Sequence, residues 1–330
     1  MIKNVIGLGL ESSCDETGVS LVKNGSKILS NLIYSQIDLH QEYSGVVPEI
    51  ASRAHLETIN PLIDQALKKT KISFQDLDYI AATNRPGLVG SLLVGWQSAK
   101  TISLALKIPL IAINHLEAHL YAPFLEGHKL SFPYIGLLVS GGNTVLYEIK
   151  GINQMKIISK TVDDAVGEAY DKVSKYLELG YPGGPIIEEL ARNAVKKEPL
   201  FPKILTDPQD ERFSYSGLKT AVINYIKSNP NKPKTEIVYS FQERALELLI
   251  RRVFKSARDR KIKTIVVAGG VAANKRLRDL LEKNKNENEK ILIPSPSLCT
   301  DNGAMIAGLG YQYYLKKKFA PLETDVSPRV

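Results

Sequence analysis

The stretch Ile111-Ala112-Ile113-Asn114-His115-Leu116-Glu117-Ala118-His119 joins an apolar segment to a polar one in a way that indicates the fold. The apolar run from Pro109 to Ile113 predicts a buried strand, and Asn114 is typical of the N-cap of a following helix. Open α/β sheets bind their ligands just beyond strand ends of this kind. The stretch therefore predicts an α/β fold with a functional site at the start of this helix.

His115 and His119 stand four residues apart on the predicted helix. At about 100° per residue their imidazoles share one helix face, a spacing that suits a divalent metal. Glu117 lies about 200° round the helix from His115 and so points away. This excludes the His-Glu-x-x-His arrangement of zinc proteases, in which the Glu beside the first His is the general base. The alternative is a pair of surface histidines without a ligand.

The composition, with 44% hydrophobic and 24% charged residues, is that of an ordinary globular protein. A chain of 330 residues exceeds the size at which one core keeps growing, so we expect two lobes. The longest nearly apolar run, Gly87 to Trp96, is too short to span a bilayer, and we expect no leader at the N-terminus. Cys14 and Cys299 do not make a disulfide framework. We therefore expect a cytoplasmic protein with no membrane partner, and the formal net charge of +8 favours a polyanionic partner.

An acidic turn follows the first predicted strand, at residues 2–10. Glu11, Asp15 and Glu16 crowd three carboxylates into six residues, and their repulsion requires a positive group to offset it. We expect this turn to hold a metal, a water or a substrate hydroxyl, although Asp and Glu are also ordinary turn formers. Two strands joined by the hairpin signal Asn24-Gly25 come next, at 19–22 and 27–34.

The rest of the chain predicts two halves built to one plan. Helical and strand patterns alternate in the first half, at 48–69, 78–83, 88–106 and 109–113. The second half opens with strands at 134–139 and 145–149, which repeat the plan of the hairpin at 5–22. We therefore expect two related halves facing each other across a cleft. Further predicted elements are helices from 163, after Pro185, at 214–227, at 235–260, after Asn274 and at 303–314, and strands at 263–268 and 291–293.

Three glycine-rich turns of the second half are candidates for contact with an anion, because consecutive glycines let backbone N–H groups approach a ligand. They are Ser140-Gly141-Gly142-Asn143-Thr144, Tyr181-Pro182-Gly183-Gly184-Pro185 and Gly269-Gly270. The last turn lies between a strand and a helix, which is the general form of a nucleotide-binding corner. A tight hairpin or a sharp corner is the alternative at each turn.

Two carboxylates of the second half are also candidates. Asp171 lies beyond the first turn of its helix, and a salt bridge to Lys175 is the alternative explanation. Asp301 precedes the helix at 303–314, where Thr300 or Asp301 is alternatively an N-cap. Placed on a second lobe facing the His pair, Asp301 would complete a two-His, one-Asp set that suits ferrous iron or zinc.

Eight motifs, spread from about residue 5 to residue 310, occur in a fixed order. They are Glu11-Ser-Ser-Cys-Asp-Glu-Thr-Gly18, Gly45-Val-Val-Pro-Glu49, His115-Leu-Glu-Ala-His119, Leu138-Val-Ser-Gly-Gly142, Gly167-Glu-Ala-Tyr-Asp-Lys172, Tyr181-Pro-Gly-Gly-Pro185, Ala268-Gly-Gly-Val-Ala-Ala-Asn274 and Asp301-Asn302. In this order they resemble the universal tRNA threonylcarbamoyladenosine transferase family, once described as glycoproteases, and in particular its bacterial branch.

The resemblance implies an α/β fold of the two-lobed actin-like (ASKHA) type, with duplicated ribonuclease-H-like domains and a nucleotide cleft between them. We expect residues 1–128 to form the N-terminal lobe with the acidic hairpin and the His pair. Residues 129–303 would form the C-terminal lobe with the glycine-rich turns, and the helix at 304–330 would pack back on the first lobe.

The resemblance also implies the activity: transfer of a threonylcarbamoyl group from threonylcarbamoyl-AMP to N6 of adenosine 37, in tRNAs that read codons beginning with A, with release of AMP. One divalent metal, iron(II) or alternatively zinc, would be held by His115, His119 and Asp301. Asp15 matches an acidic position proposed to assist the chemistry. An ATP- or AMP-type nucleotide and the donor would contact Leu138, Val139, Ser140, Gly141, Gly142, Asp171, Gly184, Glu188 and Asn274. Besides tRNA, the implied partners are an inactive paralogue of the same fold, a small P-loop ATPase and an enzyme that supplies the adenylate.

The chain departs from the family at two positions. Asn143 stands where His is common, so an imidazole there does no essential proton transfer in this chain. Glu188 stands where Asp is common, and its longer side chain can reach the same ribose or threonine groups. The basic clusters at 251–263, 275–278 and 316–318 are either tRNA contacts or solvated faces.

Two other functions stay open. One is a small-molecule kinase of the same fold that uses ATP and magnesium, although histidine ligands disfavour magnesium. The other is a catalytically silent scaffold paralogue, which we would expect to lack the two histidines and the aspartate.

Overall fold

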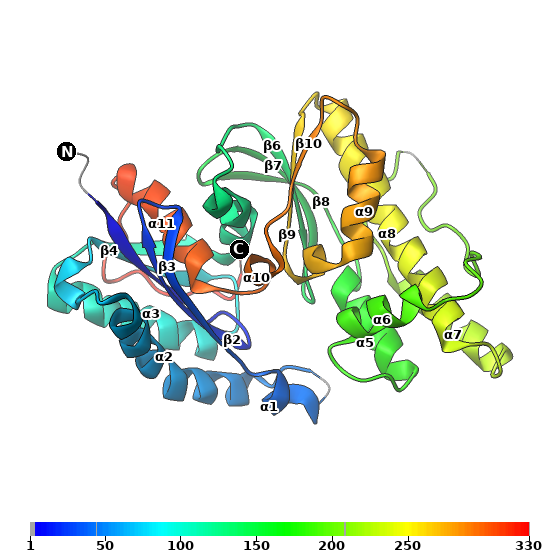
Figure 1. Cartoon of the computed structure of the whole chain (residues 1–330), viewed down its shortest axis with the longest axis horizontal. Coiled ribbons are helices and arrows are strands. Elements are labelled where there is room, and N and C mark those ends of the chain that lie inside the picture. Colours follow the sequence, from blue (N-terminus) through cyan, green and yellow to red (C-terminus); the bar gives the residue numbers. More distant parts are fainter. Residues whose placement is uncertain (1–3, 44, 208, 330) are drawn as a thin grey trace. The chain divides into compact units, whose positions relative to one another are not determined.

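The computed structural model describes residues 4–43, 45–207 and 209–329 (Figure 1). The chain divides into two compact units: unit 1 is Met1–Leu130 with Thr300–Val330, and unit 2 is Ser131–Cys299. The predicted start of the first strand, at residues 2 and 3, lies outside the described residues. We expected Asp301 on the second lobe, but the division at Thr300 assigns it to the unit that holds the His pair.

The sheet of unit 1 has five strands in the order β3-β2-β1-β4-β5. They are β1 (Ile6–Glu11), β2 (Glu16–Lys23), β3 (Lys27–Ser35), β4 (Tyr79–Arg85) and β5 (Leu110–Asn114). The first three form an antiparallel meander, and β4 and β5 then add parallel to β1. Asn24 and Gly25 turn the chain between β2 and β3 with φ angles of 53° and 72°, as a tight hairpin requires.

Helices cover both faces of this sheet (Figure 1). The helices of unit 1 are α1 (Ile37–Gln41), α2 (Pro48–Thr70), η1 (Phe74–Asp76), α3 (Val89–Leu106), α4 (His115–Tyr121), η2 (Ala122–Glu126) and α11 (Gly303–Leu315). On one face α2 and α3 bury Ile59 and Trp96 in an apolar core. On the other face α11 packs so closely that a Cβ at Gly9 would lie 2.2 Å from the Gly303 carbonyl oxygen. Because Asp301 immediately precedes α11, this packing brings Asp301 into unit 1.

Unit 2 has a second sheet with the order β10-β9-β6-β7-β8. Its strands are β6 (Tyr134–Val139), β7 (Thr144–Gly151), β8 (Gln154–Lys160), β9 (Thr264–Ala268) and β10 (Lys290–Leu292). Again three strands form an antiparallel meander, and two more add parallel to the first of them. The predicted duplication is therefore confirmed. The sequence did not predict β8, because this edge strand is mostly exposed and lacks a regular apolar alternation.

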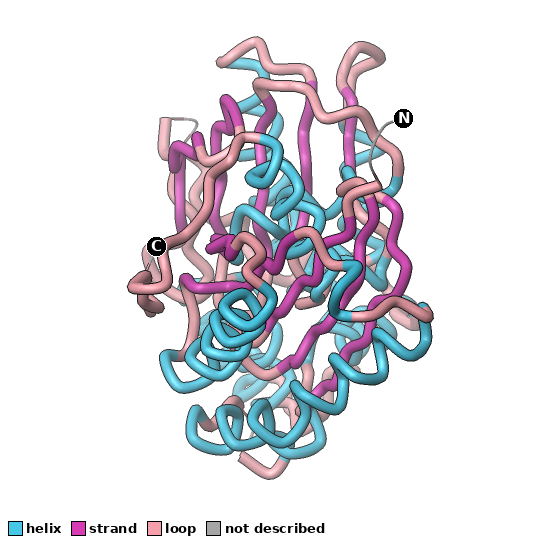
Figure 2. The backbone as a smooth tube through the Cα atoms, turned by 90° about the vertical axis from the view of Figure 1, so that its left-hand side faces the viewer, coloured by secondary structure: helices cyan, strands magenta, loops and turns pink. Residues whose placement is uncertain are grey.

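The helices of unit 2 are α5 (Val166–Tyr176), α6 (Gly183–Arg192), α7 (Ser216–Ser228), α8 (Lys234–Asp259), η3 (Gly270–Ala273), α9 (Lys275–Asn284) and α10 (Pro296–Cys299). The longest helix of unit 2, α8, packs on the sheet, shares its apolar core and contacts α6, α7 and α9. Figure 2 shows the strands of the chain in magenta, flanked by helices in cyan. Among the described residues, no helix is both long and apolar enough to cross a membrane.

Candidate active site

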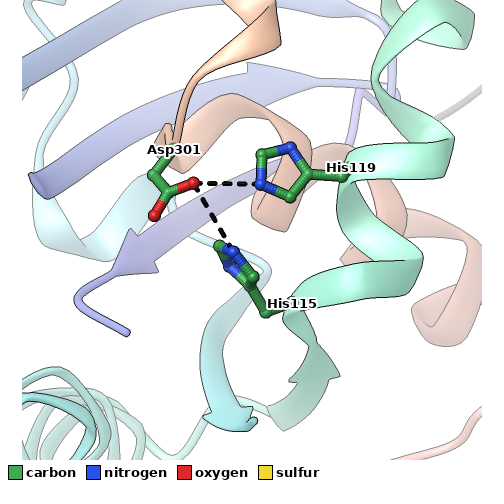
Figure 3. Close-up of side chains that lie close together, drawn as sticks. All are labelled: His115, His119 and Asp301. Carbon is green, nitrogen blue, oxygen red and sulfur yellow. Dashed lines mark hydrogen bonds and ion pairs between the residues drawn. The ribbon is translucent and has the colours of Figure 1, made fainter. Parts of the chain in front are cut away.

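Three side chains that the sequence suggested as metal ligands lie together in unit 1 (Figure 3). Asp301 Oδ1 is 2.9 Å from His119 Nε2 and 3.5 Å from His115 Nε2. One possible ligand atom from each residue lies within 4.8 Å of the other two. Both histidines are buried and Asp301 is half-buried, so the three donors converge in a largely water-excluded position. This group is able to bind a metal ion.

Local structure directs each of the three side chains. The Asn114 side chain caps α4 by accepting hydrogen bonds from the Leu116 and Glu117 amides, so the helix starts at His115 as predicted. Next to Asp301, the N-cap of α11 is Asn302, whose side chain accepts a hydrogen bond from the Met305 amide. Neither Thr300 nor Asp301 serves as that cap, and the Asp301 carboxylate instead contacts the two imidazoles.

Glu11 holds His115 from the side opposite Asp301. Its Oε2 lies 2.9 Å from His115 Nδ1 and accepts a 2.6 Å hydrogen bond from the Thr83 hydroxyl. Its Oε1 accepts from the Ser13 amide. With Nδ1 of His115 directed at a carboxylate, Nε2 is left for a metal, and a carboxylate behind a ligating histidine is the usual supporting contact at such sites. The sequence suggested Glu11 only as part of the acidic turn.

The electrostatics of this group fit a cation. Burial alone would lower the pKa of His115, but the charges of Glu11 and Asp301 outweigh it and raise the pKa to about 9. Burial would likewise raise the pKa of Asp301, but His115 and His119 lower it to about 2. Two nitrogens and one carboxylate oxygen, in surroundings that favour positive charge, match the donor sets of iron(II) and zinc.

The acidic turn divides its three carboxylates between different partners. Glu11 faces His115, as described above. Burial, together with the charges of Asp301 and Asp15, raises the pKa of Glu16 well above its usual range, and Glu16 shares a hydrogen bond with Asp15. The raised pKa of Glu16 favours its neutral form, and the His115 imidazole faces Glu11, so both reduce the repulsion that the sequence indicated. Asp15 is half-buried.

In unit 2 the glycine-rich turns pack against one another. A Cβ at Gly167 would lie 2.5 Å from the Ser140 carbonyl oxygen, and one at Gly269, where φ is +92°, would lie 2.3 Å from the Val139 carbonyl oxygen. These close contacts join the β6–β7 turn to α5 and to the turn after β9. By contrast, a Cβ at four other glycines of these turns would meet nothing within 4 Å: Gly141, Gly142, Gly184 and Gly270. The space beside the α-carbon is therefore open at these four positions.

Asp171 and Asn143 each stabilise one of these turns. Asp171 Oδ1 accepts a 2.7 Å hydrogen bond from the Gly183 amide, which is the contact that explains its carboxylate inside a helix. Burial raises the pKa of Asp171. Asn143, at the position where His is common in the family, donates from its backbone amide and its side chain to the Ser140 hydroxyl. Leu138 and Val139 are buried at the end of β6.

The side chains of Asn274 and of Glu188, a residue of α6, both contact the start of α9. The Asn274 side chain caps this helix by accepting from the Leu277 amide, and it donates to Gln242. Glu188 Oε1 accepts from the Lys275 amide at 2.9 Å and pairs with Arg192. The oxygen of the Asn274 side chain and one oxygen of Glu188 thus already have partners within unit 2. All the candidate nucleotide contacts lie in unit 2, and the candidate metal ligands and Asp15 lie in unit 1.

Comparison with known proteins gives a consistent result. A family model described as tRNA N6-adenosine threonylcarbamoyltransferase matches residues 27–308. A relative of that name from Syntrophomonas wolfei is 44% identical over 332 residues, covering 99% of this chain and 98% of its own. Another from Thermosipho melanesiensis is 49% identical over 311 residues, covering 94% and 95%.

Solved structures resemble the chain in fold at low sequence identity. Full-length HypF in its phosphate- and nucleotide-bound form has a TM-score of 0.66 and 15% identity, with 96% of this chain and 47% of HypF aligned. Component A of the (R)-2-hydroxyglutaryl-CoA dehydratase of Acidaminococcus fermentans has a TM-score of 0.56 and 16% identity, with 94% and 99% aligned. Together with the duplicated sheets, this likeness supports the predicted actin-like (ASKHA) fold class.

Proposed function

This chain belongs to the tRNA N6-adenosine threonylcarbamoyltransferase family, and from that premise we propose which of its residues carry the reaction. The protein is an acyltransferase that modifies tRNA. The donor in our proposal is threonylcarbamoyl-AMP, and the acceptor is N6 of adenosine 37 in tRNAs that read codons beginning with A. In this reaction a bond forms between N6 and the carbamoyl carbon. The bond from that carbon to the AMP phosphate oxygen breaks, and AMP leaves with the electron pair.

The chemistry needs positioning and charge stabilisation more than a strong catalyst. The exocyclic amine of adenine is a weak nucleophile, because its lone pair is delocalised into the ring. The donor is a mixed anhydride with a good leaving group. Holding the two reactants together and stabilising the charge that develops on the carbonyl oxygen therefore supply most of the acceleration.

His115 Nε2, His119 Nε2 and Asp301 Oδ1 would hold one divalent metal ion, and we propose iron(II), with zinc as the alternative. The observation that supports this is the convergence of two nitrogens and one oxygen within 4.8 Å. Glu11 would keep His115 in the tautomer that presents Nε2. When bound, such an ion supplies Lewis-acid character to a substrate oxygen.

Asp15 would accept the proton that N6 loses. It is half-buried, it lies in the turn between β1 and β2, and its side chain shares a hydrogen bond with Glu16. That hydrogen bond would hold the carboxylate in one orientation. Asp15 also shares a hydrogen bond with the Cys14 side chain, and the amine would donate to an oxygen lone pair that neither neighbour uses.

The glycine-rich turns of unit 2 would hold the nucleotide part of the donor. The support is the set of four glycines with open space beside the α-carbon, at Gly141, Gly142, Gly184 and Gly270. Backbone N–H groups at such turns bind phosphate. Leu138, Val139, Ser140, Asp171, Glu188 and Asn274 would contact the donor or hold these turns in place.

The tRNA phosphates would bind to unit 2, because this unit carries the whole net charge of the chain. It has 28 Lys and Arg against 20 Asp and Glu, whereas unit 1 has 15 of each. Many arginines of the predicted clusters are engaged inside the unit. Arg251 and Arg252 donate to backbone carbonyls, Arg258 pairs with Glu289, and Arg276 pairs with Glu243.

Three exposed lysines at one end of the second sheet are available to bind an external anion. Lys261 and Lys263 precede β9, and Lys290 begins β10, where its amide donates to the Lys263 carbonyl. All three are exposed and form no ion pair with any described residue. We propose that they contact tRNA phosphates.

An inactive paralogue of the same fold and a small P-loop ATPase would assist this chain in the cytoplasm. These partners are inferred from the family to which the chain belongs.

The test is the variant Asp15→Ala in the full chain, assayed for transfer from threonylcarbamoyl-AMP to unmodified tRNA, with the family's partner proteins added for turnover. We expect it to fold, to hold metal and to bind AMP as the unchanged protein does, and to lose transfer. Undiminished transfer would show that Asp15 is not the base.

A further inference from the structure

His55 is a fully buried histidine of α2 that the mechanism above does not use. Both of its ring nitrogens contact the acidic turn. Nε2 lies 2.9 Å from the Cys14 carbonyl oxygen, and Nδ1 lies 2.7 Å from the Thr17 hydroxyl oxygen. A histidine with a purely structural role in the core could take the hydrogen-bond partner of each ring nitrogen from any part of the fold. Here the shortest contact of each nitrogen is with one of the four residues Cys14 to Thr17, which contain Asp15, and Gln36 Nε2 lies farther from Nδ1, at 3.5 Å.

The partners determine the tautomer of His55. A carbonyl oxygen only accepts, so Nε2 must carry the proton and donate to Cys14. Nδ1 then accepts from the Thr17 hydroxyl. Burial lowers the pKa of His55, which agrees with a neutral ring that has one donor and one acceptor.

A second contact holds the next peptide group of the turn. The Gln36 amide donates to the Asp15 carbonyl at 3.1 Å. The carbonyls of Cys14 and Asp15 belong to the peptide groups on the two sides of the Asp15 α-carbon. His55 and Gln36 therefore fix both peptide planes from which the Asp15 side chain projects.

We propose that His55 is a positioning residue for Asp15, acting through its hydrogen bond to the Cys14 carbonyl. This inference rests on the proposed function, in which Asp15 accepts the proton of the amine. A displacement of a catalytic group by about 1 Å lowers the rate on the order of 100-fold, while substrate binding elsewhere is preserved.

Two substitutions separate the two bonds of His55. In His55→Gln the side-chain nitrogen reaches the position of Nε2 and still donates to Cys14. In His55→Asn the shorter amide reaches only the position of Nδ1, so the bond to Cys14 is lost. We expect His55→Asn to lower kcat by about 10- to 100-fold with KM for the donor and the metal content unchanged, and His55→Gln to restore kcat to within about threefold of the original.

His40→Asn is the matched control. His40 is also buried and belongs to the same network, through a 3.2 Å contact between its Nε2 and the Gln36 side-chain oxygen, but within the described part of the chain it forms no hydrogen bond to the turn. We expect it to lower the free energy of unfolding and to leave kcat unchanged. If His40→Asn lowers kcat as far as His55→Asn, or if His55→Asn has unchanged kcat, the proposal is wrong. Equal losses in His55→Asn and His55→Gln would also overturn it.

A spectroscopic measurement keeps the proposal testable if His55→Asn does not fold. The chain has two cysteines, so carbonyl-labelled cysteine gives two carbonyl signals, and nitrogen shifts of the histidine rings report the tautomers. We expect His55 to carry its proton on Nε2, and the Cys14 carbonyl signal to keep its position in His55→Gln. A proton on Nδ1 would contradict the proposal.

Asp15→Asn, measured in parallel, separates this inference from the proposed function. If Asp15→Asn keeps transfer, the role of Asp15 fails and that of His55 fails with it. If Asp15→Asn loses transfer and His55→Asn keeps it, only the inference about His55 fails.

Discussion

The Tyr313 hydroxyl donates a 2.7 Å hydrogen bond to Glu117 Oε2, and both side chains are buried. This contact confirms that Glu117 points away from the two histidines that flank it in sequence. It ties α4, which carries His115 and His119, to α11, which follows Asp301. A protease-like general base is therefore absent from this position, and the same carboxylate instead joins the two elements that supply the candidate metal ligands.

We expect Tyr313→Phe to lower the free energy of unfolding of the metal-free protein by about 1–3 kcal/mol, because a buried carboxylate loses a donor. Urea unfolding in the presence of a chelator measures this. Tyr311→Phe is the control, since the Tyr311 hydroxyl has no hydrogen bond to any described residue. Metal content and transfer should survive in both variants, and loss of metal in Tyr313→Phe would contradict a purely structural role.

Separate Ala substitutions of His115, His119 and Asp301 should each abolish stoichiometric metal binding. Each removes one of three ligands, and two ligands do not hold the ion at micromolar concentration. Elemental analysis of the purified chain measures this, with His128→Ala as the control, because His128 is exposed and lies outside the group. Full metal content in any of the three variants would remove that residue from the site.

Glu11→Gln should weaken metal binding by about 10- to 100-fold without removing a ligand, because the carboxylate that orients His115 loses its charge. Competition with a chelator of known affinity measures the change. Thr83→Val is the matched comparison, because it removes only the other hydrogen bond of Glu11 Oε2 and should have a smaller effect. An unchanged affinity in Glu11→Gln would show that the contact is incidental.

Gly184→Ala and Gly183→Ala should differ although the glycines are neighbours. A Cβ at Gly184 meets nothing within 4 Å, so the fold should be unaffected while binding of AMP weakens by about tenfold, or ~1.4 kcal/mol. A Cβ at Gly183 would lie 2.6 Å from the Ser174 Cβ, so that variant should be destabilised. Thermal unfolding and titration with AMP measure both effects. Unchanged AMP binding in Gly184→Ala would place the nucleotide elsewhere.

Replacing Lys261, Lys263 and Lys290 together by Gln should weaken tRNA binding and make it less dependent on salt. Neutralising two to three phosphate contacts reduces the slope of log affinity against log salt by about 2. The control is the same change at Lys316, Lys317 and Lys318 of unit 1, whose net charge is zero. Equal slopes for the first variant and the unchanged protein would exclude this end of the sheet as a tRNA contact.

Asp164 should make unfolding of unit 2 depend on pH in the acid range. Partial burial alone would raise its pKa, but hydrogen bonds from Lys172 and Lys219 lower the pKa below 3.8. A carboxylate with a lowered pKa in the folded state contributes stability above its ordinary pKa, and this is lost as pH falls through the folded-state value. Asp164→Asn should therefore cost about 0.5–1 kcal/mol at neutral pH and progressively less below pH 3.8. A difference that stays constant with pH would refute this assignment.

Local sequence patterns were sufficient to predict most of the secondary structure. Apolar runs and helical periodicity predicted nearly all the strands and helices, and the Asn24-Gly25 signal predicted its hairpin, because these features depend on neighbours within a few residues. The shared face of His115 and His119 and the opposite direction of Glu117 followed from helix geometry alone. The edge strand β8 escaped prediction, because one exposed strand has no buried alternation of its own.

Only the tertiary structure decided the contacts between residues that are far apart in sequence. Asp301 reaches His119 across 182 positions, because α11 returns to the sheet of unit 1, and no local pattern carries that information. The same reason explains why Glu11 faces His115, and why Arg251 and Arg276 are engaged inside unit 2 rather than free for tRNA. Sequence by itself determined which groups are available, and packing across the sheets decided which of them meet.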